Sequence, residues 1–186
     1  SMVLSHNPSV SSTEWHRGTC RATKSWSRVT LSVIEVLVAM AYATFADAPV
    51  DVAIAEVGLG GSWDATNVAD ATVAVVMPIS LDHAEYLGDS IEGIAEEKAG
   101  IIKPGSFVVL AGQEDEVGEI VLRRVAEVGA AAAIEGREFG VRRRDLAVGG
   151  QQVTLQGLTG SYDEVIMPLH GAHQAGNAAC AVAAVE

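Results

Sequence analysis

Reactive side chains occur at three places in this chain, next to apolar segments or a helical segment. Glu56 closes one apolar run, Asp82 and His83 follow a second, and Lys98 lies late in the helical pattern that comes next. A carboxylate could bind a hard cation, while an imidazole could act as a ligand or a base. Charged and titratable side chains are thus expected to gather at the predicted strand ends.

Each of these positions also has a structural explanation. A glutamate before glycines is usually a capping or turn residue, and a lone histidine in a loop usually makes a hydrogen bond. Lys98 near a helix C-terminus could simply interact with the helix dipole. Taken singly, none of these residues distinguishes chemistry from structure.

Glycines form two candidate phosphate cradles. Backbone N–H groups of Gly60 and Gly61 in the GLGG turn could hold a phosphate, although the turn does not match GxGxxG. Residues 18–25 have the spacing of GxxxxGK[ST], but Thr23 replaces the second glycine and no strand precedes them. We interpret this second match as coincidence, so the sequence has no recognisable P-loop.

Alternating strand and helix patterns must position these side chains. Short apolar runs predict strands, and segments with helical spacing or capping residues predict helices. This alternation predicts an α/β fold with a mainly parallel, doubly wound sheet. Because ligands bind beyond the carboxyl ends of such strands, we expect Glu56 and His83 to lie close together there, with Lys98 pointing toward them. The predicted strands are Val50–Val57, Thr72–Met77, Phe107–Leu110 and Ala131–Ile134, and the predicted helices are Val29–Ala46, Ser90–Gly100, Glu116–Val128 and Gln174–Glu186.

A small antiparallel element is predicted after the fourth strand. Residues 139–157 alternate like a hairpin with Gly149 and Gly150 as its turn, and Glu164–Met167 predicts one more strand. Residues 1–28 show no clear period, so we treat them as a poorly defined segment before a single domain of residues 29–186. The last helix reaches Glu186 without a cap, and we expect the natural domain to continue.

Charge and hydropathy exclude several classes of function. A net charge of −12 argues against a nucleic-acid partner, and the basic run Arg142–Arg144 fits a solvated strand end. No apolar run is long enough to span a membrane, and Val29–Ala46 has the pattern of a buried amphipathic helix. Cys20 and Cys180 form no metal-binding or disulfide pattern, and Cys180 resembles a core residue. We therefore expect a cytoplasmic protein.

Four segments carry a resemblance to a known family. They read EVGLGGSWDATN from Glu56, ISLDHAEYLG from Ile79, IAEEKAGIIKPG from Ile94 and GAHQAGNAA from Gly171. In this order they resemble the folylpolyglutamate synthase/dihydrofolate synthase family, within the wider Mur ligase group, over about residues 31–186. The resemblance implies part of a central ATPase domain, whose P-loop and C-terminal partner domain are not found in this sequence.

The resemblance also implies roles for individual residues. Glu56 and His83 match ligands of magnesium ions, and Lys98 matches a lysine that is carbamylated in the family. Asn177 matches an asparagine that contacts the nucleotide, and Asp64 lies in the loop that faces pterin and phosphate. Ser62 stands where the family usually has arginine, which removes a cation able to meet a carboxylate or phosphate. Glu56, His83 and Lys98 would together form the catalytic metal site.

The function implied is that of an ATP- and Mg²⁺-dependent ligase. Such an enzyme phosphorylates a carboxylate of folate or dihydropteroate, and the amine of glutamate then attacks the acyl phosphate to give an amide. The alternatives are another Mur-type amide ligase and a noncatalytic fragment that binds partners without turnover. Because the P-loop and a C-terminal domain are missing, we expect this chain alone to be inactive. The choice of folate substrate and the oligomeric state stay open.

Overall fold

A computed structural model of the chain describes residues 2–6, 32–48, 50–81 and 90–186. The chain divides into two compact units, formed by residues 1–5 with 54–186 and by residues 6–53. The predicted sites at Asp82 and His83 lie outside the described residues. Within the described part, none of the helices is both long and apolar enough to cross a membrane.

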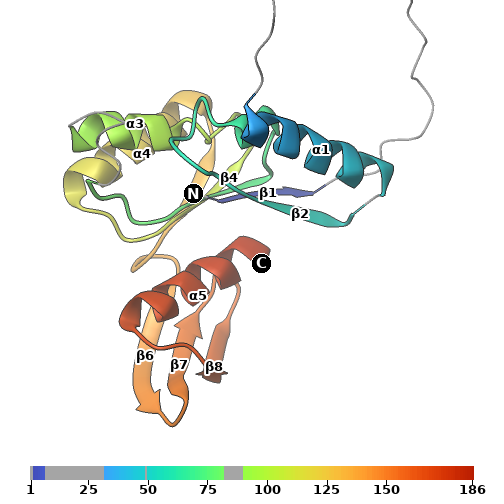
Figure 1. The fold of residues 1–186 in the computed structure, drawn as a ribbon. Helices are drawn as coiled ribbons and strands as arrows, with labels where there is room; N and C mark the ends of the chain where they lie inside the picture. The colour runs from blue at the N-terminus through green and yellow to red at the C-terminus, as the bar shows by residue number, and fades with distance from the viewer. Residues whose placement is uncertain (1, 7–31, 49, 82–89) are drawn as a thin grey trace, which may run out of the picture. The chain divides into compact units, whose positions relative to one another are not determined.

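The main sheet has the strand order β2-β1-β3-β4-β5 (Figure 1). Strands β3 (Val73–Val76), β4 (Phe107–Leu110) and β5 (Ala131–Ile134) are parallel to one another. Their nearly continuous apolar sequences suit strands that are covered on both faces. β4 and β5 have the predicted bounds and β3 lies within its predicted range. The predicted α/β fold with a mainly parallel sheet is confirmed.

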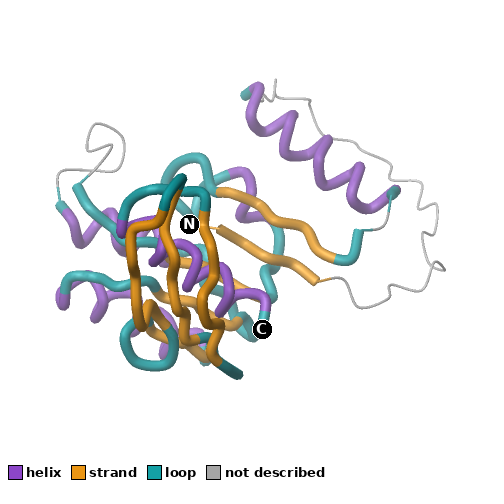
Figure 2. The backbone as a smooth tube through the Cα atoms, turned by 90° about the horizontal axis from the view of Figure 1, so that it is seen from below, coloured by secondary structure: helices purple, strands orange, loops and turns teal. Residues whose placement is uncertain are grey.

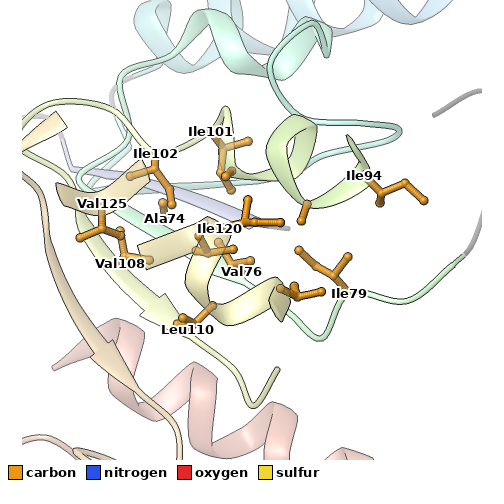
Figure 3. Packing of buried hydrophobic residues seen from close by; sticks show 14 of the residues in the cluster. Ala74, Val76, Ile79, Ile94, Ile101, Ile102, Val108, Leu110, Ile120 and Val125 are labelled. Carbon is orange, nitrogen blue, oxygen red and sulfur yellow. The ribbon is translucent and has the colours of Figure 1, made fainter. Parts of the chain in front are cut away.

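Helices α3 (Ile91–Ala99) and α4 (Asp115–Val128) cover one face of this sheet. Ser90 begins α3 by accepting a hydrogen bond from the backbone N–H of Gly93, and Gly129 ends α4 in a left-handed conformation, as the sequence predicts. Figure 3 shows the packed apolar side chains between the helices and the sheet, which include Ile94, Val76, Val108, Leu110 and Ile120.

A second sheet of three antiparallel strands lies beyond the other face. Its strands are β6 (Gly140–Ala147), β7 (Gly150–Gln156) and β8 (Ser161–Met167). Helix α5 (Ala172–Val185) runs along these strands (Figure 2) and shares a buried cluster with both sheets. Its inward residues are small, which permits close packing. They are Ala175, Ala179, Cys180, Ala183 and Ala184.

The hairpin turn differs by one residue from the prediction. Its two turn residues are Val148 and Gly149, and Gly150 is already the first residue of β7, paired with Ala147. Gly150 is buried, and a side chain there would collide with the backbone carbonyl of Met167. This glycine is therefore required by strand packing rather than by the turn.

Within its own unit of residues 6–53, the first helix is not buried as predicted. The helix forms as α1 (Val33–Asp47), but none of its residues is buried, and Val33 is 75% exposed. Its start is fixed by a capping box, in which Ser32 and Glu35 exchange hydrogen bonds. Apolar residues occur around most of this helix, so its composition predicts burial, but burial also requires a covering surface.

The first predicted strand is also less buried than expected. It forms as β2 (Val52–Glu56), in which Val52 is 55% and Ile54 is 62% exposed. Strand β1 (Met2–His6), from the segment predicted to be poorly defined, lies between β2 and β3 in the sheet order and pairs antiparallel with β3. β2 is therefore an edge strand rather than a buried parallel strand, and alternate residues face solvent.

Candidate functional site

The loop after β2 is organised around Asp64. One carboxylate oxygen of Asp64 accepts hydrogen bonds from the backbone N–H groups of Gly58 and Leu59, each at 3.1 Å. The other oxygen accepts from the backbone and the hydroxyl of Thr66, at 2.9 and 2.6 Å, and begins the short 3₁₀ helix η1 (Ala65–Val68). Asp64 thus fixes the shape of the glycine turn from its C-terminal side.

These hydrogen bonds also set the charge state of Asp64. Burial raises its pKa, but the hydrogen bonds from Thr66, Leu59 and Gly58 favour the carboxylate more strongly and hold the pKa below its ordinary value. Asp64 is therefore a charged residue in the loop at neutral pH, and its oxygens are occupied by protein donors.

Glu97 of α3 holds the same loop from the other side. Its Oε1 accepts from the backbone N–H groups of Gly61 and Trp63, both at 3.2 Å, and its Oε2 accepts a short hydrogen bond from the Ser62 hydroxyl. The Ser62 backbone N–H also donates to the Glu97 carbonyl at 3.1 Å. Ser62, which replaces the arginine expected from the resemblance, is therefore bound to α3.

Gly61 and Gly100 allow the loop and the end of α3 to touch. A Cβ at Gly61 would collide with the Glu97 carbonyl and lie 2.9 Å from the Lys98 Cα, and a Cβ at Gly100 would collide with Ser62. Only glycine permits this close approach of two backbones. Gly60 and Gly61 are both buried, and the Gly61 N–H already has a protein acceptor.

The second half of the loop is attached to the segment after α3. The Asn67 amide donates to the carbonyls of Ser62 and Gly100, at 3.1 and 3.3 Å. Lys103 donates to the carbonyls of Asn67 and Ala69, at 2.6 and 2.7 Å, and pairs with Asp70 at 3.2 Å. The DATN segment and the KPG segment of the sequence are therefore one structural unit.

A cavity of about 700 Å³ lies beside this unit. Residues of the loop, including Ser62 and Asn67, line it together with Arg123 and Arg124 of α4. Arg123 pairs with Glu96 at 3.0 Å, and Arg124 donates to the Ile102 carbonyl at 3.1 Å. Among the described residues, the Asn67 Oδ1 and Arg124 Nε atoms are buried without a hydrogen-bond partner.

Of the predicted metal-site residues, Glu56 and Lys98 belong to the described part of the chain, and His83 does not. Glu56 is the last residue of β2 and is exposed, and Lys98 is half-buried in the last turn of α3. Over the described ranges, neither side chain has a hydrogen bond or ion pair, and no three His, Cys, Asp or Glu side chains cluster as metal ligands. An exposed carboxylate with free oxygens suits a hard cation such as Mg²⁺, although it supplies only one protein ligand.

A second group of polar contacts lies at the carboxyl ends of the parallel strands. The Gln113 side chain accepts from the Ile79 N–H at 2.9 Å and donates to the Met77 carbonyl at 3.0 Å, which fixes the chain just after β3. Glu135, directly after β5, accepts from the Gly112 N–H at 2.9 Å, and its carboxylate lies against Gly176 of α5. The start of α5 therefore lies at this edge of the sheet.

Asn177 is exposed on the second turn of α5. Its side-chain amide donates to the Gln174 side chain at 3.4 Å, so the carbonyl oxygen of Asn177 is free to accept from a ligand. Gly171 precedes the helix with φ of 99° and serves as its N-cap, without a side-chain cap. This exposed amide at the carboxyl edge of a parallel sheet is in the position expected of a ligand contact.

Comparison with known proteins identifies the family. The sequence profile of the Mur ligase middle domain matches residues 23–185. The chain belongs to the Mur ligase middle-domain family.

Individual relatives refine this assignment. A dihydrofolate synthase/folylpolyglutamate synthase of Mycobacterium tuberculosis is 54% identical over 162 residues, which are 84% of this chain and 33% of that protein. A folylpolyglutamate synthase of Lacticaseibacillus casei is 37% identical over 148 residues, which are 80% of this chain and 35% of that protein. The chain thus spans about a third of the length of these relatives.

Solved structures agree with the sequence comparison. The M. tuberculosis folylpolyglutamate synthase complexed with ADP matches with a TM-score of 0.81, covering 84% of this chain and 36% of that one at 54% identity. A complex of folylpolyglutamate synthase with AMPPCP and folate matches with a TM-score of 0.76 at 38% identity, covering 78% and 36%. The Mur ligase middle domain of this chain therefore has the fold of nucleotide-binding relatives, and the predicted resemblance is confirmed.

Several residues that build this middle domain were not predicted from the sequence. Glu97, Lys103, Gln113 and Glu135 each bind backbone groups of a distant segment. Their sequence signal is position only. Glu97 precedes Lys98, Glu135 directly follows β5, and Gln113 lies three residues after β4. Such residues shape the loops in which the predicted ligand contacts lie.

Proposed function

We propose that this chain is the central part of an ATP- and Mg²⁺-dependent ligase that joins L-glutamate to folate or dihydropteroate. The observation that carries the proposal is the likeness to the ADP complex of the M. tuberculosis enzyme, at 54% identity over most of this chain. The likeness to a complex with AMPPCP and folate supports a nucleotide and a folate as ligands.

The proposed roles are those that the family resemblance implies for individual residues. Asn177, which is exposed on α5, binds the nucleotide together with the turn of Gly60 and Gly61. Asp64 holds the loop that faces the pterin. Glu56 and His83 hold Mg²⁺, which when bound supplies positive charge next to the phosphates. Lys98, the residue after Glu97 on α3, is the residue proposed to be carbamylated.

The proposed reaction has two steps. The substrate carboxylate takes the γ-phosphoryl group of ATP and becomes an acyl phosphate, with release of ADP. The amine of glutamate then attacks the acyl carbon and displaces phosphate, and an amide bond forms. Positioning and charge neutralisation supply most of the catalysis in phosphoryl transfer, so the rigidity of the loops around Asp64 and Glu97 contributes directly.

A second candidate function is nucleotide binding without turnover. It is favoured by the fact that the chain spans about a third of its relatives. The two candidates share the nucleotide site and differ in ligase activity. We expect the polypeptide of 186 residues by itself to show no glutamate-dependent release of ADP, since most of the length of its relatives is not part of it.

Titration with ADP in the presence and absence of Mg²⁺ tests the shared nucleotide site. We expect binding that weakens when Mg²⁺ is removed, and that weakens in Glu56→Ala and in Asn177→Ala. Gln152→Ala, on the small sheet, is the control and should bind as the unmodified chain does. Equal binding by all four proteins, or no dependence on Mg²⁺, would contradict the proposed site.

A further inference from the structure

Gln151 is a fully buried glutamine on the inner face of the small sheet. Its exposed fraction is 0%, and it shares the inward face of β7 with Val153 and Leu155, which pack in the cluster around α5. An amide in an apolar layer lowers stability unless both of its ends are hydrogen-bonded. The contacts of Gln151 therefore explain why a polar residue is retained here.

Both ends of the Gln151 side chain have partners. Its Oε1 accepts from the Nε of Arg144 on β6 at 2.6 Å, and its Nε2 donates to the backbone carbonyl of Gly171 at 3.1 Å. A guanidinium can only donate and a carbonyl can only accept, so the orientation of the amide is determined by its partners. Arg144, Gln151 and Gly171 form one directed chain of hydrogen bonds.

This chain ends on the residue that starts α5. Gly171 is the N-cap of the helix, its φ of 99° suits glycine, and no side chain caps the helix from within. The same Gly171 carbonyl accepts the helical hydrogen bond from Gln174 at 3.2 Å. Gln151 is therefore a side chain that connects the start of α5 to the small sheet by a hydrogen bond.

The first turns of α5 also carry the proposed nucleotide contact. Asn177 is bonded to Gln174, whose backbone N–H is bonded to Gly171. These two hydrogen bonds connect the Gly171 carbonyl to the side chain of Asn177 through Gln174. The Glu135 carboxylate lies close to Gly176, the residue before Asn177.

We propose that Gln151 is a positioning residue for the nucleotide side of the site, acting on Asn177 through Gly171. This inference rests on the proposed function for the role of Asn177, and on the described contacts for the role of Gln151. It assigns a functional consequence to the small antiparallel sheet, which contains none of the predicted ligand contacts.

Two substitutions distinguish the two hydrogen bonds of the Gln151 amide. Gln151→Glu keeps an oxygen for Arg144 but places a second oxygen opposite the Gly171 carbonyl, so the donor is lost. Gln151→Met removes both contacts and keeps a side chain of similar size. Gln152→Met is the matched control, because the next residue in the strand points to the opposite face and is only half-buried.

Hydrogen exchange of residues 169–175 is the first measurement. We expect roughly tenfold faster exchange in both Gln151 variants, as for the loss of one buried hydrogen bond, and no change in Gln152→Met. If Gln151→Met does not fold, the hydrogen exchange of Gln151→Glu alone tests the proposal. Unchanged exchange in residues 169–175 of a folded Gln151 variant would overturn the proposal.

A double-mutant cycle on ADP affinity is the second measurement. We expect Gln151→Glu to weaken ADP binding about five- to tenfold in the unmodified chain and to have no further effect in Asn177→Ala, because it acts through that residue. Equal effects in both backgrounds would contradict positioning of Asn177. If the unmodified chain takes up no ADP, the proposed function fails for this chain, while the exchange comparison still decides the role of Gln151.

Discussion

Glu97 and Gly61 show how single residues shape the site. One carboxylate of α3 accepts from the backbone N–H groups of Gly61 and Trp63, and the absence of a side chain at Gly61 lets the two backbones touch. The backbone N–H groups of Gly61 and Trp63 therefore already have a hydrogen-bond acceptor in the protein. The Gly61 N–H, which the sequence offered as a phosphate contact, is therefore already used by Glu97.

Gly61→Ala should destabilise the protein by about 1–3 kcal/mol, because the new methyl group must displace the backbone of α3. The measurement is the free energy of unfolding in urea. Gly160→Ala is the control, since a Cβ at Gly160 meets no atom within 4 Å. Equal stabilities of the two variants would show that the loop and α3 are not in contact in solution.

Asp64 makes stability depend on pH. Because hydrogen bonds hold its pKa below the ordinary value, its contribution is fully present above the pKa of the unfolded chain and is lost as the pH falls through the lower pKa of the folded protein. Asp64→Asn should therefore have a lower melting temperature than the unmodified chain at pH 7, and the gap should narrow toward pH 3.

Asp163→Asn is the control for this experiment, because Asp163 is an exposed carboxylate on β8. Its melting temperature should follow that of the unmodified chain at every pH. A gap for Asp64→Asn that is constant between pH 7 and pH 3 would show that the carboxylate charge of Asp64 does not contribute.

The sequence predicted some of these residues and not others. Asp64 lies in a segment with a recognisable order of residue types, so it could be identified before its contacts were known. Glu97 could not, because its partners are two backbone N–H groups and one hydroxyl about 35 positions earlier in the chain. Backbone groups carry no sequence signal, and only the fold brings them to a particular carboxylate.

Helix α5 packs against both sheets. Glu186, the residue directly after the helix, is hydrogen-bonded to the small sheet and its turn. Glu186 accepts hydrogen bonds from the backbone of Leu158, the hydroxyl of Thr159 and the hydroxyl of Tyr162. The hydrogen bond from Thr159 is the main reason that the pKa of Glu186 lies below its ordinary value, although burial opposes it. This carboxylate helps to organise the turn between β7 and β8, together with the Gln156 side chain, which donates to the carbonyls of Gly157 and Gly160.

Glu186→Ala should increase hydrogen exchange in residues 157–162 and leave exchange in β3 and β4 unchanged, because only the turn loses its acceptor. Val185→Ala is the matched control, since Val185 is 79% exposed beside it. If Val185→Ala has the same effect as Glu186→Ala, the cause is fraying of the helix end rather than loss of the carboxylate.

Helices whose ends are set by capping residues were predicted well. Capping residues such as Ser90 and Gly129 act on their own backbone, so their effect can be read in the sequence. Burial of α1 and β2 was predicted wrongly, because burial depends on which other surface lies against an element. The pairing of β1 with β3 is equally nonlocal, since it joins strands about 70 residues apart.

At the scale of the whole molecule, the chain is a Mur ligase middle domain with about a third of the length of its relatives. Its parallel sheet, the loop after β2 and the start of α5 all lie within residues 23–185, the part that matches the Mur ligase middle domain. The central claim is that these residues can serve in a glutamate ligase. That claim is best tested in a protein of full length.

The direct test is a chimera of the M. tuberculosis enzyme in which the 162 matched residues are replaced by those of this chain. We predict ADP release that requires Mg²⁺, a folate or dihydropteroate, and glutamate, and that falls at least a hundredfold in Glu56→Ala, on the order of the loss of one charge-stabilising group. A chimera that folds and binds ADP but shows no glutamate-dependent ADP release would contradict the account, as would full activity in Glu56→Ala.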